Sequence, residues 1–197
     1  MRKTVLLVLT DYWADWEAAY AVAGINDVQG YVVRTVAMDS SPKASIGGVR
    51  AAVDYCVGDY DDFSDVGFII LPGWYTWMEG NYDEIASFVK RARSSDVPIA
   101  AICGATLFLA KHGFLNEVKH TGDEREYFLE TLRSEKEYTG EEYFVPAQSV
   151  NDGGFITANE TAALDFAVEI LRTLAISSNE EIMQWRDKHK NGMFRAN

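Results

Sequence analysis

The sequence predicts an α/β fold in which a mostly parallel sheet is covered by helices on both faces. Three observations lead to this fold class. Short apolar segments alternate along the chain with segments whose apolar residues recur at helical spacing. The connections between successive strand segments are long enough to cross over a sheet and return in parallel. The strand segments are also apolar on both faces, as in a parallel sheet buried on each side.

The first elements open the chain with a strand, a loop and a helix. Residues 5–9 are aliphatic throughout and predict a strand. Residues 15–25 predict a helix, on which apolar positions including Trp16 and Tyr20 recur at helical spacing. Residues 31–37 are a second strand, and residues 45–53, with their paired glycines, are a turn or hairpin.

The middle of the chain repeats this alternation. Residues 66–71 are an apolar strand that ends at a Pro-Gly pair. Residues 83–93 follow as a helix whose basic residues lie near its C-terminus, where they suit the helix dipole. Residues 97–102 are a fourth strand that leads directly into a helix through about Lys111.

The last elements complete one domain. Residues 154–158 predict a further strand and residues 161–174 an amphipathic helix. Ser178 to Glu181 resembles a capping box that begins a final helix, expected to fray from about His189. We therefore expect one α/β domain over residues 1–175 and a helical extension of the same domain over residues 176–197.

Composition limits the classes of protein that the chain can belong to. It has 197 residues, 48% of them hydrophobic and 13% aromatic, which suits one folded domain and argues against disorder. Its formal net charge of −12 disfavours nucleic acid and anionic membrane surfaces as partners. The apolar run near the start is too short for a signal peptide, and no segment approaches a membrane helix.

The two cysteines differ in their sequence surroundings. Neither Cys56 nor Cys103 belongs to a disulfide framework, and both suit a reducing cytoplasm, where we expect the protein to reside. Cys103 follows a strand and precedes a helix, with Ala101, Gly104 and Ala105 as small neighbours. This pattern predicts a sharp strand-to-helix turn that presents the thiol as a nucleophile. The alternative is an ordinary buried cysteine, which is our interpretation of Cys56.

The predicted turn has two chemical consequences. A thiol at a helix N-terminus lies near the positive end of the helix dipole, so we expect a lowered pKa and a favoured thiolate for Cys103. The main-chain N–H of Gly104 can also point at an oxyanion. His and Cys residues show no metal-ligand spacing, so the sequence predicts neither a metal nor a cofactor.

Three motifs make the sequence similar to the ThiJ/PfpI superfamily. They are residues 71–73 (Leu-Pro-Gly), 100–105 (Ala-Ala-Ile-Cys-Gly-Ala) and 153–158 (Gly-Gly-Phe-Ile-Thr-Ala). This group includes the parkinsonism-associated protein deglycase and intracellular protease/amidases, within the class I glutamine amidotransferase-like fold. The resemblance, over about residues 3–174, implies a flavodoxin-like three-layer α/β/α sandwich with a nucleophile elbow. It also implies a homodimer.

The resemblance suggests partners for Cys103. In the family a glutamate after the first strand approaches the sulfur, and Glu17 matches it. The Pro-Gly-Trp turn after the third strand matches the family's oxyanion loop, which places a main-chain donor at Gly73 or Trp74. The neighbouring aromatic residues of this loop either wall a substrate pocket or pack in the core or at a subunit interface.

The sequence departs from the protease-like members beside the nucleophile. Those members carry a histidine directly after the cysteine, where this chain has Gly104. Other members place a histidine near residue 120, so His120 is a candidate base or proton shuttle, although the alignment matches Thr121.

Two functions remain open at this point. The first is a cysteine-dependent hydrolase-like or glyoxalase/deglycase-type enzyme acting on a small carbonyl, amide or peptide substrate without a cofactor. The absence of a histidine after Cys103 favours a small-molecule substrate. The second is a non-catalytic oxidative-stress sensor or holding chaperone in which Cys103 is oxidised and Glu17 stabilises the product.

Overall fold

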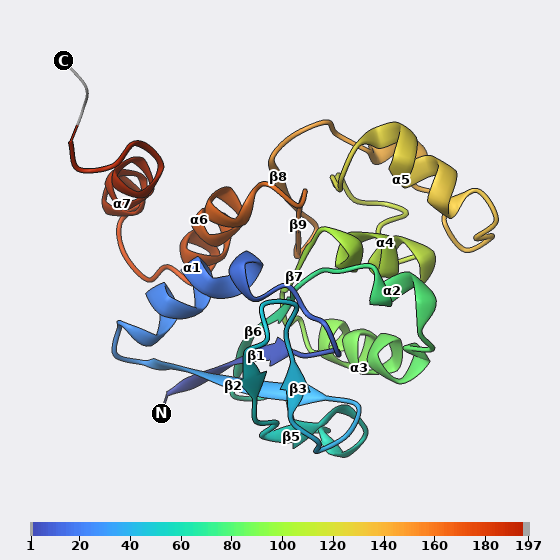
Figure 1. Ribbon diagram of the computed structural model, residues 1–197, viewed down its shortest axis with the longest axis horizontal. Helices are drawn as coiled ribbons and strands as arrows, with labels where there is room; N and C mark the ends of the chain where they lie inside the picture. The colour runs from blue at the N-terminus through green and yellow to red at the C-terminus, as the bar shows by residue number, and fades with distance from the viewer. Residues whose placement is uncertain (1, 195–197) are drawn as a thin grey trace.

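The computed structural model describes residues 2–194 and confirms the predicted α/β fold (Figure 1). Its main sheet has seven strands in the order β5-β2-β1-β6-β7-β9-β8, with every neighbouring pair parallel except β8 with β9. The strands are β1 (Lys3–Val8), β2 (Tyr31–Ala37), β5 (Tyr55–Cys56), β6 (Val66–Leu71), β7 (Ile99–Ile102), β8 (Ser149–Asp152) and β9 (Phe155–Ala158).

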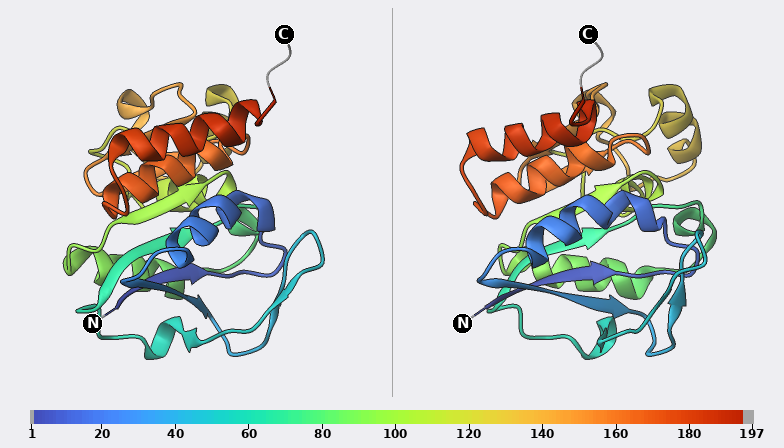
Figure 2. Two further views of the ribbon diagram at one scale, coloured as in Figure 1. Left: turned by 90° about the vertical axis from the view of Figure 1, so that its left-hand side faces the viewer. Right: turned by 60° about the vertical axis from the view of Figure 1, so that its left-hand side comes forward.

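Helices cover both faces of this sheet (Figures 1 and 2). On one face lie α1 and α6 with α7 packed outside them, and on the other lie α3 and α4, accompanied by the short α2 and by α5. The helices are α1 (Asp15–Asn26), α2 (Thr76–Glu79), α3 (Asp83–Ser94), α4 (Gly104–Lys111), α5 (Arg125–Leu132), α6 (Ala163–Thr173) and α7 (Asn179–Asn191). None of the helices described is long and apolar enough to cross a bilayer.

The central strands are apolar on both faces because each face has its own core. In β1, Leu6 and Val8 point into the core on the α3 side, whereas Val5 and Leu7 point into the core on the α1 side. This alternation is the period of two that a strand imposes on its side chains. It explains why an aliphatic run without polar alternation folds here as a central strand.

Helix α1 buries a different face from the one that its large apolar residues suggest. Its buried positions include Glu17, Ala18 and Ala21, whereas Trp16 is 46% exposed and Tyr20 is 37% exposed. Small alanines let the helix approach the sheet closely, so the bulky side chains lie outside that contact. The exposed ring of Tyr20 packs edge-on against Trp185 of α7.

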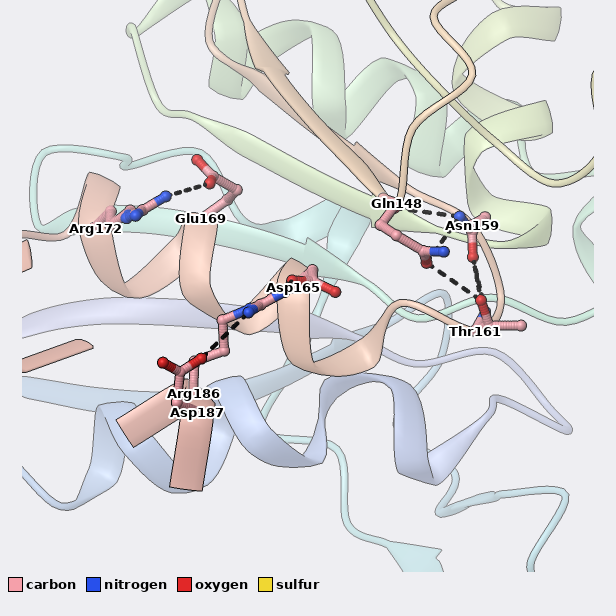
Figure 3. Close-up of polar contacts among 8 residues, drawn as sticks. All are labelled: Gln148, Asn159, Thr161, Asp165, Glu169, Arg172, Arg186 and Asp187. Carbon is pink, nitrogen blue, oxygen red and sulfur yellow. Dashed lines mark hydrogen bonds and ion pairs between the residues drawn. The ribbon is translucent and has the colours of Figure 1, made fainter. Parts of the chain in front are cut away.

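The C-terminal helix, α7, is capped at its start and is attached to α6 by an ion pair. Ser178 and Glu181 form the predicted capping box at the start of α7. Arg186 of α7 pairs with Asp165 of α6 at 2.6 Å, and this contact holds the two helices together (Figure 3). The helix extends to Asn191, and the ring of His189 packs against that of Trp185 with the ring centroids 4.6 Å apart; the expected fraying from His189 stays a prediction.

Strand β8 and helix α5 were not anticipated, whereas the predicted hairpin is present. The edge strand β8 runs antiparallel to β9, and α5 lies in the long connection between α4 and β8. The predicted turn or hairpin near residues 45–53 is a hairpin of two short strands, β3 (Lys43–Ala44) and β4 (Arg50–Ala51).

Candidate active site

Cys103 occupies the sharp turn between β7 and α4. Its backbone has φ 55° and ψ −132°, a region that non-glycine residues rarely adopt and that costs about 1–3 kcal/mol. Hydrogen bonds hold the residue there: its N–H donates to the Ala158 carbonyl at 3.0 Å, and the Thr106 N–H donates to its carbonyl at 2.9 Å. The nucleophile elbow predicted from the sequence is therefore present, and its side chain is 8% exposed.

Two glycines let the neighbouring loop approach this turn. A Cβ on Gly73 would lie 2.5 Å from the Ile102 carbonyl oxygen and 2.6 Å from the Cys103 Cβ. A Cβ on Gly104 would overlap the carbonyl oxygen of Trp74. Trp74 itself has φ 139°, so it adopts a conformation that glycine takes with less strain. The close approach of this loop to the elbow is thus achieved although a tryptophan replaces the family's glycine.

Glu17 lies beside the cysteine, fully buried at the start of α1. The Gly73 N–H donates to its Oε2 at 2.6 Å, while its Oε1 is buried without a hydrogen-bond partner. Burial raises the pKa of Glu17 to about 8, although the hydrogen bonds from Gly73 and the Cys103 thiol act in the opposite direction. The carboxyl group is therefore mostly protonated near neutral pH and can donate a hydrogen bond to the sulfur.

The expected lowering of the thiol pKa is wrong. Burial is the largest cause of a raised pKa for Cys103; Glu17 raises it further when it is ionised, and so does the negative charge of Asp123. The N–H of Gly104 at the start of α4 favours the thiolate, as predicted, but its effect is smaller than that of burial. The resting cysteine is therefore a thiol that needs a base to ionise it.

Asp123 supplies a second acid group at the sulfur, and the sequence analysis missed it. A carboxylate oxygen of Asp123, one of Glu160 and the Cys103 sulfur all lie within 4.8 Å of one another. The Glu160 N–H donates to Asp123 Oδ1 at 2.8 Å and fixes this side chain. Burial is the largest cause of a raised pKa for Asp123. The signal available in the sequence was a Gly-Asp pair just beyond His120, but only a histidine was considered as the base in this segment.

The same three groups are of the kind that bind metal ions. A thiol and two carboxylates within 4.8 Å of one another have the spacing of a cation site as well as of a proton-transfer site. The spacing of His and Cys in the sequence does not reveal this group, because its members come from three separate loops.

His120 is engaged elsewhere. Its Nδ1 lies 2.8 Å from the Val118 carbonyl oxygen and its Nε2 lies 2.9 Å from the Tyr138 hydroxyl. The ring is fully buried and packs against Phe128 and Phe144. With both nitrogens occupied, its contacts are those of a core residue. The structure brings Glu17 and Asp123 to the sulfur, whereas no hydrogen bond among the described residues joins His120 to it.

Thr121, the aligned alternative, fixes the loop that carries Asp123. It is buried, its N–H donates to Thr157 Oγ1 at 2.8 Å, and its Oγ1 donates to the Ala147 carbonyl at 3.0 Å. These bonds attach the loop to β9 and the segment before β8. Thr121 thereby positions Asp123 and leaves its own hydroxyl committed.

Main-chain N–H groups near Cys103 are candidates for oxyanion donors. The Gly104 N–H is close enough to the sulfur to influence its pKa. The Gly73 N–H is already used by Glu17, so of the two donors considered after the third strand, Trp74 is the one that this bond leaves available. The candidate oxyanion donors are therefore the N–H groups of Gly104 and Trp74.

A cavity of about 810 Å³ adjoins the cysteine. Asp123 and Glu160 line it, and each has a carboxylate oxygen within 4.8 Å of the Cys103 sulfur, so the sulfur lies just behind this part of the lining. Gln148, Asn159 and Thr161 also line the cavity and are hydrogen-bonded to one another, for example from Thr161 Oγ1 to Asn159 Oδ1 at 2.7 Å (Figure 3).

The aromatic side chains of the segment that follows β6 lie partly in the core and partly at the cavity. Trp77 is buried, donates through Nε1 to the Pro72 carbonyl at 2.7 Å and packs against Phe108. Tyr75 lines the cavity and is 58% exposed. The loop therefore contributes one ring to the core and another to the wall of the cavity.

Together, the fold and the site define an α/β protein with a buried cysteine on a strand-to-helix elbow, flanked by acid side chains. The chain belongs to the DJ-1/PfpI family, whose profile matches residues 3–173. This match confirms the ThiJ/PfpI resemblance seen in the three sequence motifs.

Relatives and solved structures agree with this assignment. A Bacillus subtilis (strain 168) protein described as the uncharacterized protease YdeA is 34% identical over 194 residues, which cover 98% of this chain and 94% of the relative. The thiJ/pfpI family protein from Bacillus anthracis is similar with a TM-score of 0.88 and 29% identity, over 96% of this chain and 91% of that one. The DJ-1 superfamily protein Atu0886 from Agrobacterium tumefaciens gives a TM-score of 0.84 and 30% identity, over 95% and 99%.

Proposed function

We propose that this chain is a cysteine-dependent hydrolase-like enzyme that acts on a small carbonyl or amide substrate. The observation that carries the proposal is the position of the Cys103 sulfur, close to Glu17 and within 4.8 Å of the carboxylate oxygens of Asp123 and Glu160, which line a cavity. The name of the Bacillus subtilis relative, an uncharacterized protease, supports a hydrolase-like role. The cavity of about 810 Å³ suits a small molecule or a short peptide segment.

The first step is ionisation of the thiol and attack on the carbonyl. Asp123, as a carboxylate, accepts the proton of Cys103. The sulfur then forms a bond to the carbonyl carbon, and the C=O electron pair moves to oxygen. The N–H groups of Gly104 and Trp74 stabilise this oxyanion. Protonated Glu17 adds no negative charge at the site, so it does not oppose the ionisation.

The second step depends on the substrate. With an amide, the C–N bond breaks, Asp123 returns its proton to the leaving nitrogen, and a thioester remains on Cys103. Water, deprotonated by Asp123, then attacks the thioester, and the C–S bond breaks to release the acid and the thiol. With an aldehyde there is no leaving group, and the first product is a hemithioacetal.

Replacement of each cysteine in turn tests the proposal. Cys103→Ser is expected to abolish turnover of a panel of small amides and aldehydes, because a hydroxyl is a far weaker nucleophile at this site. Cys56→Ser is the matched control, since Cys56 is a free cysteine on the remote strand β5, and it should keep full activity. Full activity in the Cys103→Ser protein would contradict the proposal.

The sensor alternative has one observation in its favour. The unpartnered Oε1 of Glu17 can hydrogen-bond to an oxidised Cys103 sulfur. Against it, peroxide reacts with thiolate, and burial raises the pKa of the Cys103 thiol. Peroxide titration followed by intact mass separates the two functions. Stepwise oxygen addition at Cys103, together with no turnover of any amide or aldehyde, would support the sensor.

A further inference from the structure

The cavity beside Cys103 has an uneven charge. Three carboxylate side chains line it, those of Asp123, Glu124 and Glu160, and one guanidinium, that of Arg125. Arg125 pairs with Glu141 at 2.8 Å, so its positive charge is already compensated. The lining therefore presents net negative charge to a molecule that enters the cavity.

The acid groups lie where the reacting part of a substrate must lie. Asp123 and Glu160 each place a carboxylate oxygen within 4.8 Å of the Cys103 sulfur. The fully buried Glu17, which also approaches the sulfur, has its Oε1 atom without a hydrogen-bond partner. A substrate held against the sulfur thus meets carboxyl oxygens whose hydrogen-bonding capacity is open.

Aromatic rings add to the same preference. Tyr75 and Tyr127 line the cavity; burial is the largest cause of a raised pKa for Tyr127, and the nearby Asp123 and Cys103 raise it further. The face of a tyrosine ring attracts a cation that lies within about 6 Å of its centre. Carboxylates and tyrosine rings in one cavity are the combination that binds an ammonium or guanidinium group.

We propose that the Cys103 cavity selects substrates that carry a positive charge, an ammonium or guanidinium group, within about one side-chain length of the reacting carbonyl. This inference rests on the proposed function of the same site and names its substrate class. Glu160 is the specificity residue: its main-chain N–H holds Asp123, whereas its exposed side chain is free to contact the cation.

A cationic substrate would also activate the resting thiol. Burial of the sulfur and the negative charge of Asp123 both raise the pKa of Cys103. A positive charge placed beside the sulfur favours the thiolate. The cysteine would then ionise mainly when a substrate of the right charge is bound.

The proposal is tested with two thiol reagents of opposite fixed charge, 2-(trimethylammonium)ethyl and 2-sulfonatoethyl methanethiosulfonate. In each, the sulfur attacks the S–S bond, forms a mixed disulfide and releases methanesulfinate. The rates at which the two reagents modify Cys103 are measured in a Cys56→Ser background, with EDTA and at low salt. Each rate is divided by the rate at which the same reagent reacts with 2-mercaptoethanol, which corrects for the intrinsic reactivity of the reagent. Since no turnover is required, the result does not depend on whether the proposed enzymatic activity is found.

The cationic reagent is expected to be preferred about tenfold over the anionic one, after this correction. Glu160→Gln should reduce the preference about threefold, since it removes one carboxylate and keeps the main-chain N–H. The matched control is Glu117→Gln, which makes the same change in net charge at an exposed position outside the cavity and should leave the preference within about 1.5-fold. Equal reduction by both variants, no preference, or a preference for the anion would overturn the proposal.

A binding measurement covers the case in which neither reagent reaches the sulfur. The Cys103→Ser protein is titrated with n-butylammonium and with butyrate, followed by tyrosine and tryptophan fluorescence. The ammonium compound should bind more tightly, and Glu160→Gln should remove the difference. Equal or absent binding of the two compounds contradicts the inference.

Discussion

The N–H of Gly73 donates a 2.6 Å hydrogen bond to Oε2 of Glu17, and this bond joins the end of β6 to the acid that faces the nucleophile. It occupies the main-chain N–H of Gly73, one of the two groups that the family resemblance suggested as an oxyanion donor. It also fixes one carboxyl oxygen and leaves the other directed at the site. The geometry of the acid and the identity of the oxyanion donors are therefore set together.

Gly73→Ala should lower the free energy of unfolding by about 1–3 kcal/mol, because the new Cβ would lie 2.5 Å from the Ile102 carbonyl oxygen. Urea denaturation measures the change. Gly67→Ala, in the strand β6 that precedes Gly73, is the control, since its Cβ would lie 3.4 Å from the flexible Lys3 side chain, and it should change stability by less than about 1 kcal/mol. Similar losses in the two variants would show that the close approach at Gly73 is unimportant.

Glu17→Gln should flatten the dependence of stability on pH between about 4.5 and 8. In this window the unfolded chain loses the Glu17 proton and the folded protein keeps it, because the folded pKa is raised to about 8. The unfolded state thus binds fewer protons, and stability falls as pH rises. The nearby groups Cys103, Asp123 and Glu160 remain in both proteins.

Urea unfolding of wild type and Glu17→Gln at about pH 5 and about pH 8 measures this difference. The variant should gain stability relative to wild type at the higher pH. Glu117→Gln, an exposed change of the same kind, should follow the wild-type curve. Parallel curves for wild type and Glu17→Gln would mean that Glu17 is not the group that titrates.

Asp123→Asn should have opposite effects on turnover and on alkylation. Turnover should fall about 100-fold, because the base that takes the thiol proton is lost. Reaction of Cys103 with neutral iodoacetamide at pH 7 should become faster, since removal of a nearby negative charge lowers the pKa of the thiol. A fall in both rates would indicate a structural role for Asp123, and unchanged turnover would remove it from the mechanism.

His120→Ala should reduce stability by about 2–4 kcal/mol while the folded protein keeps kcat within about threefold. The variant loses two hydrogen bonds and the packing of the ring against Phe128 and Phe144. Tyr138→Phe, which removes only the Nε2 partner, should cost about 1 kcal/mol and leave the pH profile of kcat/KM unchanged. A large loss of kcat in folded His120→Ala protein would restore the histidine as a catalytic candidate.

The central strands and the elbow could be predicted because their signals are local. Residues 31–37 and 66–71 have the bounds expected for β2 and β6, and the small residues around Cys103 indicated its turn. Strand β8 escaped because it is an edge strand of mixed polarity, whose pairing with β9 depends on tertiary contacts. The same holds for the buried face of α1, where alanines rather than Trp16 and Tyr20 meet the sheet.

The residues of the candidate site likewise include some that have a local signal in the sequence and others that are positioned by tertiary contacts. Cys103 lies at the end of a strand, so its position along the chain sufficed to find it, whereas Glu17 was identified through the family resemblance. Asp123 reaches the sulfur only because hydrogen bonds from distant residues fold its loop over α4. The predicted lowering of the Cys103 pKa was wrong for the same reason: the start of the helix is visible in the sequence, whereas burial is a property of the folded protein. The expected homodimer, cytoplasmic location and division at residue 175 stay predictions.

The bond from the Glu160 main chain to Asp123 has an evolutionary consequence. Every amino acid except proline supplies this donor, so position 160 can change its side chain while the acid stays in place. A single substitution there can redirect which molecules are accepted and leave the reacting groups intact. Proteins that share this chemistry can therefore differ in the substrates that they accept, and substrate specificity can change through a single substitution at this position.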